Sequence, residues 1–136
     1  MMTNDAFIQR LANDIAPEAK FTPNAYYDPD GDCIEFVAVE GPFYAERIDR
    51  WVTVYYSQET DDLVGSQIKG MKQFFKCYPQ IRALEIHDGH MSVAHLFRAI
   101  GWSSDEREAG SILVYKKLIE AAEETETTVE LEECCS

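Results

Sequence analysis

The chain has 136 residues, of which 46% are hydrophobic and 12% aromatic, and its 25 acidic against 12 basic residues give a formal net charge of −13. This size and apolar content fit one domain with a single core that needs neither metal nor disulfide to fold. The negative charge disfavours direct binding to nucleic acid or to an anionic membrane, no run is apolar enough to span a bilayer, and the first seven residues lack the pattern of a secretory signal.

The first predicted element is an amphipathic helix over residues 4–16. Its apolar residues recur with a helical period on one side, and Pro17 marks its end. The apolar side consists of Phe7, Ile8, Leu11, Ala12 and Ile15. We expect this N-terminal helix to pack on a sheet.

From residue 24 the hydrophobic period changes to two, which is typical of strands. A first strand leads into the turn Asp28–Asp32, and a second strand follows over residues 33–39. A further hairpin joins residues 51–56 to residues 63–68. Because each connection is too short for a parallel crossover, we predict an antiparallel meander sheet of four to five strands.

After Gly70 the pattern leaves alternatives open. Residues 71–78 fit either a helical turn or a prolonged strand, and residues 81–86 fit a strand. A helix capped by Asp88 or Ser92 is expected to run through Met91 and Phe97 and to close at Gly101.

The segment 111–119 also fits either state. Its residues have good strand chemistry, but the length of the segment favours a helix over residues 112–122. One stripe of that helix would carry Ile112, Tyr115, Ile119 and Ala122. The chain as a whole is therefore predicted to be an α+β fold with an N-terminal helix and C-terminal helices packed on the antiparallel sheet.

The end of the chain is charged and poor in aromatic residues. We predict a single α+β domain over residues 1–124 followed by a flexible acidic tail over residues 125–136. The cysteines at 33, 77, 134 and 135 contain no Cys-x-x-Cys motif, so reduced thiols and a cytoplasmic location are expected.

Part of the predicted sheet follows a familiar pattern. Residues 27–32 read Tyr-Asp-Pro-Asp-Gly-Asp before a strand, residues 52–56 read Val-Thr-Val-Tyr-Tyr, and residues 63–68 read Leu-Val-Gly-Ser-Gln-Ile after a polar turn. On these motifs the stretch 26–70 resembles the YuzE-like family of small bacterial domains of unknown function. The resemblance implies a small antiparallel sheet followed by a helix, and it implies no catalytic residues.

Three carboxylates, on Asp28, Asp30 and Asp32, have the spacing of the first half of a calcium loop. Such a loop then needs a glycine and a bidentate glutamate, where this chain has Cys33 and Val39. A hairpin turn is the favoured interpretation.

All the histidines, His87, His90 and His95, fall within one short segment. With Cys77, Glu85 or Asp88 they could complete a tetrahedral metal site, but none of the pairs has the four-residue spacing that directs two imidazoles at one ion from a helix. The chain also lacks a Gly-x-Ser-x-Gly motif and a glycine-rich phosphate loop. We therefore predict no catalytic residue and no cofactor, and we favour a protein that is not an enzyme.

Aromatic residues crowd the predicted sheet. They are Tyr26, Tyr27, Phe43, Tyr44, Trp51, Tyr55 and Tyr56. Adjacent tyrosines on a strand face opposite sides, so at least one face beyond the core should be aromatic. Cross-strand packing is one explanation, and a protein interface is the other. The interface residues that we predict are Trp51, Tyr55, Tyr26 and Phe43.

The sequence thus favours a non-enzymatic protein-binding or regulatory module, either a homodimer formed through its sheet or an adaptor for another protein. One alternative is an acidic inhibitor that imitates nucleic-acid charge and occupies a DNA- or RNA-binding protein. A second alternative is a small metal-dependent enzyme that uses His87, His90 and His95.

Overall fold

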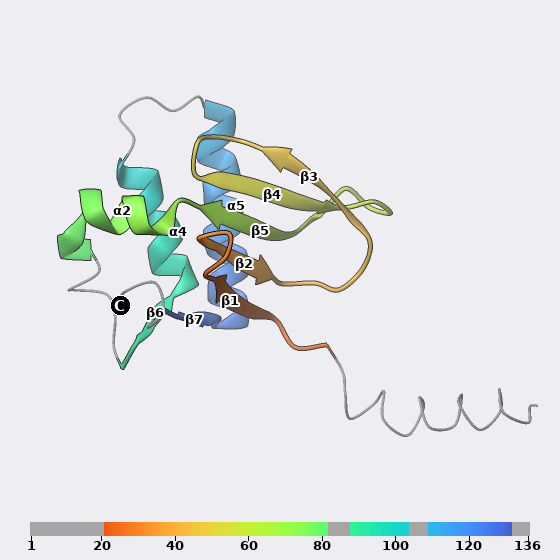
Figure 1. Cartoon of the computed structure of the whole chain (residues 1–136). Helices are drawn as coiled ribbons and strands as arrows, with labels where there is room; N and C mark the ends of the chain where they lie inside the picture. Colours follow the sequence, from red (N-terminus) through yellow and green to blue (C-terminus); the bar gives the residue numbers. More distant parts are fainter. Residues whose placement is uncertain (1–20, 82–87, 104–108, 132–136) are drawn as a thin grey trace, which may run out of the picture.

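The computed structural model describes residues 21–81, 88–103 and 109–131, and its main feature is a five-stranded antiparallel sheet (Figure 1). The strands are β1 (Asn24–Asp28), β2 (Cys33–Val37), β3 (Phe43–Arg47), β4 (Val52–Ser57) and β5 (Leu63–Lys69). The predicted α+β class and the antiparallel sheet are confirmed.

The strand order differs from that of a simple meander, because it is β1-β2-β5-β4-β3. β5 lies between β2 and β4, and the connection after β2 carries the chain across to the far edge, where β3 pairs only with β4. β5 is largely buried, whereas every residue of β3 is exposed. Burial therefore accords with the order, since the largely buried β5 lies at the centre and the fully exposed β3 lies at an edge.

The helices resolve the alternatives that the sequence left open. They are α2 (Met71–Cys77), α4 (Val93–Ser103) and α5 (Ala109–Thr125). Residues 71–77 and 111–119 are therefore helical. Gly70 adopts a left-handed conformation (φ 70°) immediately before α2. This conformation ends the extended backbone of β5 and lets the helix begin at the next residue.

A short two-stranded sheet, β6 (His90–Ser92) with β7 (Thr128–Glu130), completes the fold. Met91 lies in β6 rather than in the predicted helix, which starts one residue after Ser92 and continues past Gly101 to Ser103. The Ser92 hydroxyl accepts a hydrogen bond from the His95 N–H at 3.4 Å, as expected of a cap.

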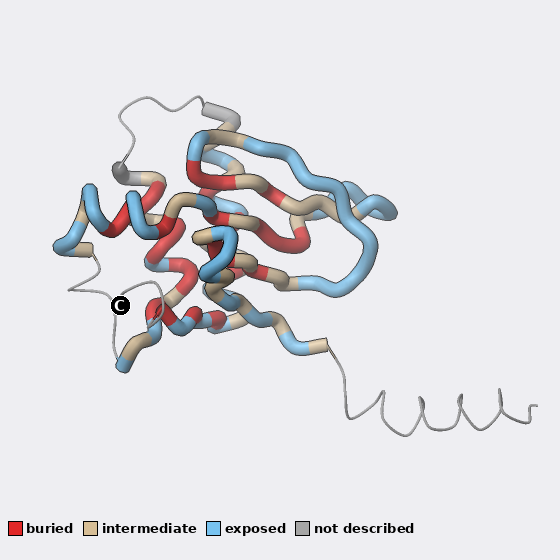
Figure 2. The backbone as a smooth tube through the Cα atoms, viewed as in Figure 1, coloured by how far each residue is buried: buried red, intermediate tan, exposed pale blue. Residues whose placement is uncertain are grey.

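The core lies between one face of the large sheet and the helices α4 and α5. Phe36 of β2 meets Phe97 of α4 edge to face, with ring centroids 6.1 Å apart. Figure 2 shows buried backbone in the central strands and the facing helices, and exposed backbone along β3. On α5 the buried stripe is Tyr115, Leu118 and Ala122, while Ile112, predicted on that stripe, is 56% exposed because it lies beyond the edge of the core.

The prediction of a flexible tail is wrong over residues 127–131. β7 pairs with β6, and Val129 and Leu131 are fully buried in the core (0% exposed). The physical reason is alternation: apolar side chains two residues apart point to the same side of an extended segment and are buried, although charged neighbours surround them in the sequence. Residues 132–136 of that tail lie outside the described residues.

Other predictions also fall outside the described part of the chain. The helix over residues 4–16 does, as do residues 82–87, which cover most of the strand predicted at 81–86. Across residues 21–81, 88–103 and 109–131, every helix is too short or too polar to traverse a lipid bilayer.

Candidate functional site

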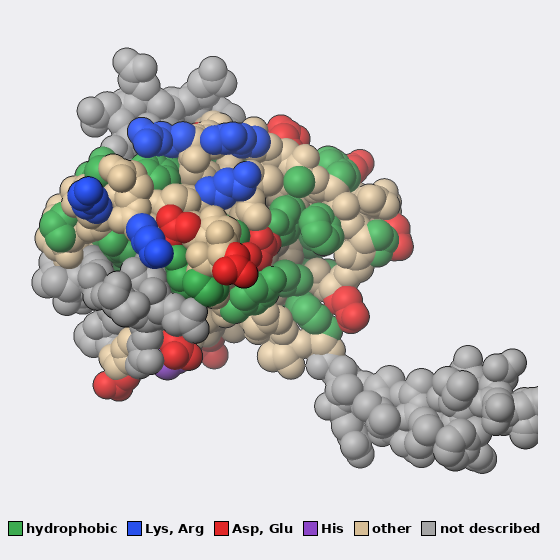
Figure 3. Space-filling model, in the orientation of Figure 1, with side chains coloured by type: hydrophobic (Ala, Val, Ile, Leu, Met, Phe, Trp, Pro, Cys, Tyr) green, Lys and Arg blue, Asp and Glu red, His purple; other side chains and the backbone are tan. Residues whose placement is uncertain are grey.

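The two faces of the large sheet differ in what covers them. α4 and α5 pack on one face, and strand alternation with the observed register defines the side chains of the other. Among the residues that the structure describes, no helix packs on this second surface, which we call the helix-free face. Its residues are Asn24, Tyr26, Asp28, Cys33, Glu35, Val37, Phe43, Ala45, Arg47, Thr53, Tyr55, Ser57, Gly65, Gln67 and Lys69. Figure 3 views the molecule from this side, with α5 behind the sheet as in Figure 1.

Aromatic rings mark both margins of the helix-free face. Tyr26 on the β1 edge is 55% exposed, and Phe43 on the β3 edge is 47% exposed. The half-buried ring of Tyr55 packs against Phe43, with centroids 4.4 Å apart. The structure therefore brings Tyr55 and Phe43 into contact, and it places Tyr26 on the same face but across the sheet.

Trp51, the fourth predicted interface residue, belongs to the core instead. It is only 9% exposed, and its ring meets Phe74 of α2 edge to face at 5.5 Å. A Cβ added at Gly70 would lie 3.0 Å from the Trp51 ring, so the indole fills the corner between β5 and α2. The prediction is wrong because residue type alone does not distinguish an exposed aromatic anchor from a buried one.

A polar group occupies the middle of the helix-free face. The Glu35 carboxylate accepts hydrogen bonds from the Tyr55 hydroxyl and from the Gln67 amide, each at 2.6 Å. The Cys33 thiol lies 3.8 Å from the same carboxylate. These contacts hold Glu35 in one orientation at the surface, where it can accept a further hydrogen bond from a bound partner.

The surroundings of Glu35 raise the pKa values of two neighbouring groups, Tyr55 and Cys33. Burial raises the pKa of the Tyr55 hydroxyl well above its usual value, and the hydrogen bond to Glu35 raises it further. Burial also raises the pKa of the Cys33 thiol, and the charge of Glu35 adds to that effect. Both groups are therefore protonated at neutral pH, so neither of the two is an anionic nucleophile.

Basic side chains gather at one end of the helix-free face. Figure 3 shows Lys and Arg over the end of the sheet next to α2, with acidic side chains in the middle and at the opposite end. In that region β3 ends at Arg47, β5 ends at Lys69, and α2 carries Lys72 and Lys76. The sequence did not predict this basic end, because a net charge does not report how charges are distributed in space.

The aspartate-rich segment forms the hairpin turn that was predicted. The Asp28 carboxylate accepts a hydrogen bond from the Asp30 N–H at 3.0 Å. The Asp32 carboxylate accepts one from the Tyr27 hydroxyl at 2.6 Å and one from the Lys72 N–H at 3.2 Å, which ties the turn to the start of α2. Asp28 and Asp32 thus stabilise the fold.

The predicted histidine cluster is only partly described. The His90 ring in β6 lies 2.9 Å from the Asp88 carbonyl oxygen, and His95 is exposed in the first turn of α4. His87 lies outside the described residues. Among the residues that the structure describes, no three histidine, cysteine or acidic side chains are grouped so as to hold a metal ion. A metal site that includes His87 stays a prediction.

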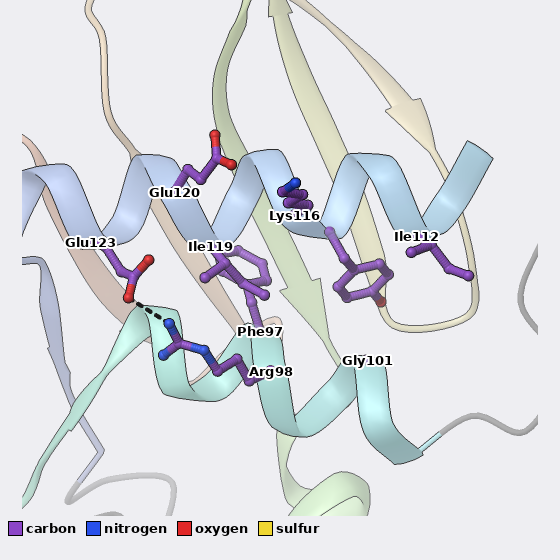
Figure 4. Close-up of a pocket in the computed structure, with 9 residues that line it drawn as sticks. Phe97, Arg98, Gly101, Ile112, Lys116, Ile119, Glu120 and Glu123 are labelled. Atoms are coloured by element: carbon purple, nitrogen blue, oxygen red, sulfur yellow. Dashed lines mark hydrogen bonds and ion pairs between the residues drawn. The ribbon is translucent and has the colours of Figure 1, made fainter. Parts of the chain in front are cut away.

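A second surface feature is a groove of about 400 Å³ between α4 and α5. Phe97, Ile112 and Ile119 contribute apolar side chains, and the Arg98–Glu123 ion pair lies at one end (Figure 4). The groove fits an apolar side chain better than a polar substrate, because its charged groups lie at its margins. The sequence did not predict this groove, because Ile112 was assigned to the apolar stripe of the helix over residues 112–122.

Comparisons of the chain with protein-family models, with curated proteins and with solved structures each find no match. The resemblance of residues 26–70 to the YuzE-like family therefore rests on the sequence motifs alone.

Proposed function

We propose that this chain is a protein-binding module that contacts its partner through the helix-free face. The observation that carries the proposal is the exposure of Tyr26 (55%) and Phe43 (47%) on a sheet face that no helix within residues 21–81, 88–103 and 109–131 covers. Large aromatic side chains are favoured anchors of protein interfaces, since they bury much apolar area at a small cost in conformational entropy.

The charges of this face support a particular kind of partner. Tyr26 and Phe43 would each need an apolar contact, and Glu35 between them would need a hydrogen-bond donor. Arg47 and Lys69 at the basic end would attract acidic side chains. We therefore infer a partner whose surface has apolar residues beside a group of carboxylates.

Two observations bear on the alternatives. An acidic mimic of nucleic acid would need carboxylates gathered over one face, and the signs on the helix-free face are mixed (Figure 3). Such a mimic would have to use another surface. The thiols of Cys33 and Cys77 are free, which supports a reducing, cytoplasmic location and makes a cell extract the appropriate source of partners.

The test compares two double variants by affinity capture from the native cell extract and quantitative mass spectrometry. The double variant Tyr26→Ala/Phe43→Ala removes the aromatic anchors. The control Ile112→Ala/Leu113→Ala removes side chains that are at least as exposed (56% and 62%) from α5. We expect the first variant to lose a captured protein by at least about tenfold, since hot-spot residues contribute on that scale.

Retention of every captured protein by Tyr26→Ala/Phe43→Ala would overturn the proposal, and so would an equal loss in both variants. Far-UV circular dichroism of each variant verifies that the fold is intact before the comparison.

A further inference from the structure

The two edges of the large sheet are not equivalent. β1 lies beside β7, which covers that edge. β3 pairs with β4 on one side, and among the described residues no strand pairs with its other side. All residues of β3 are exposed, so this edge is accessible along its whole length. An exposed edge strand is a template for pairing with another chain.

The register shows which backbone groups point away from the sheet. The Ile48 N–H donates to the Val52 carbonyl at 3.0 Å, and the Gln58 N–H donates to the Pro42 carbonyl at 3.0 Å. In an antiparallel ladder the residues that exchange hydrogen bonds alternate with those that do not, so even-numbered residues of β3 face β4. The N–H and C=O groups of Phe43, Ala45 and Arg47 therefore point outward. The Phe43 carbonyl there accepts a hydrogen bond from the Gln58 side-chain amide at 3.1 Å, a contact that a second strand would have to displace.

These outward groups favour a second copy of the chain as the partner. In an antiparallel pair centred on Ala45, Ala45 faces Ala45 of the second copy and Phe43 faces its Arg47. The Arg47 guanidinium donates in its own plane to the carbonyls of Asp49 and Arg50, which leaves its flat side to stack on a ring. In the same register Tyr44 faces Glu46, so no like charges are opposed.

Other registers are worse for this strand. A shift of two residues toward the C-terminal end opposes Glu46 to Glu46, and a further shift opposes Arg47 to Arg47, which is unfavourable directly across a strand pair. A shift of two residues in the other direction pairs β3 only over Phe43–Ala45 and sets Glu46 and Arg47 opposite Pro42 and Gly41, outside the strand. The sequence of β3 therefore matches itself best about Ala45.

We propose that two copies of this chain associate through their β3 strands, antiparallel and centred on Ala45, to form one continuous sheet. The inference rests on the proposed function in one respect: it names a second copy as a protein that this module binds. The site is the backbone edge of β3, and it requires neither Tyr26 nor the middle of the helix-free face.

The first test is sedimentation velocity of the full chain over a concentration series. We expect the wild type to move from the 15.5 kDa monomer toward twice that mass as concentration rises. Ala45→Pro removes an outward N–H without touching the ladder to β4, because proline is tolerated where the N–H of an edge strand faces solvent. We expect it to raise the dimer dissociation constant by at least about tenfold. Ile112→Ala/Leu113→Ala is the control and should dimerise like the wild type.

The second test reads the register and does not depend on how proline affects the strand. In a Cys77→Ser/Cys134→Ser/Cys135→Ser background, Ala45→Cys should form an intermolecular disulfide in an oxidised glutathione buffer. Facing residues of a hydrogen-bonded pair lie about 5.5 Å apart at Cα, within the range of a disulfide. Arg50→Cys, exposed beyond the end of β3, is the control and should cross-link at least about tenfold more slowly.

A wild type that stays monomeric at the highest concentration of the series would overturn this proposal, as would equal cross-linking at positions 45 and 50. Capture of another protein that depends on Tyr26 and Phe43 but survives Ala45→Pro would leave the proposed function standing. The two proposals can therefore fail separately.

Discussion

The covered and helix-free faces of the same sheet are built from alternate residues of the same strands, yet they carry different interactions. On the covered face Ile34, Phe36 and Ile68 are fully buried under α4 and α5. On the helix-free face their neighbours Glu35 and Gln67 form a hydrogen-bonded group with Tyr55. The comparison indicates that stability comes mainly from one face, which leaves the other free to carry recognition.

The largest change in the free energy of unfolding should come from a substitution on the covered face. Phe36→Ala removes a fully buried ring from its contact with Phe97, and we expect it to lower the free energy of unfolding by about 3–5 kcal/mol. Tyr26→Ala removes an exposed ring from the helix-free face and should change the free energy of unfolding by less than about 1 kcal/mol. Urea denaturation of both variants measures the difference, and similar losses would refute the division between the faces.

A smaller loss of stability should follow from Gly65→Ala. This substitution tests how closely β2 and β5 approach each other on the helix-free face. A Cβ at Gly65 would lie 2.3 Å from the Phe36 carbonyl oxygen, so the backbone of β2 or β5 must shift. We expect a destabilisation of about 1–3 kcal/mol. Gly31→Ala is the control, because its nearest neighbours are side-chain atoms at 3.2 and 3.3 Å that can move. Equal stability of both variants would show that β5 adjusts freely.

Tyr55→Phe sharpens the comparison through pH. Because the Tyr55 pKa is raised in the folded chain, the folded state keeps this proton after the unfolded chain has lost it. The resulting stability is complete below about pH 10, the ordinary tyrosine pKa, and is lost as pH rises through the folded value. Tyr55→Phe should therefore cost about 1 kcal/mol at neutral pH and flatten the alkaline fall in stability.

Thermal denaturation of Tyr55→Phe and wild type between neutral and alkaline pH checks this. Tyr56→Phe is a matched comparison from the covered face, where burial followed by the charge of Glu46 raises the pKa of Tyr56. An unchanged pH profile in Tyr55→Phe would contradict the assigned role of the Tyr55–Glu35 hydrogen bond.

The smallest expected effect is a difference in the rates at which the thiols of Cys33 and Cys77 are alkylated. In a Cys134→Ser/Cys135→Ser chain at mildly alkaline pH, iodoacetamide should modify the exposed Cys77 readily. Cys33 is 5% exposed and its pKa is raised, so it should react only when the sheet opens. Mass spectrometry of the time course separates the sites. Equal rates would mean that the middle of the helix-free face is open to solvent.

The sequence predicted the sheet where burial alternates. Cys33–Val37 and Val52–Ser57 place buried and less buried residues in turn, which is the periodicity that identifies strands. β3 escaped prediction because all its residues are exposed, so its sequence has no apolar alternation. The strand order also escaped, because it depends on long-range burial that no local pattern records.

The candidate site was predicted in part for a similar reason. Tyr26, Phe43 and Tyr55 were assigned to an aromatic surface from their crowding, and each lies on the helix-free face. Trp51 was assigned with them, but α2 covers it, and the packing of α2 on the sheet corner is a tertiary feature. The buried part of the C-terminal segment was missed because Val129 and Leu131 are few among many acidic residues.

β7 has a consequence for biosynthesis. Val129 and Leu131 complete the core, and β7 lies beside β1, which is nearly the whole described chain away in sequence. Contacts this distant form only after the intervening residues are available, so a nascent chain that still lacks β7 cannot reach its native state on the ribosome. Premature termination before residue 131 would therefore yield an incompletely folded product, recognisable by its rapid degradation in the cell.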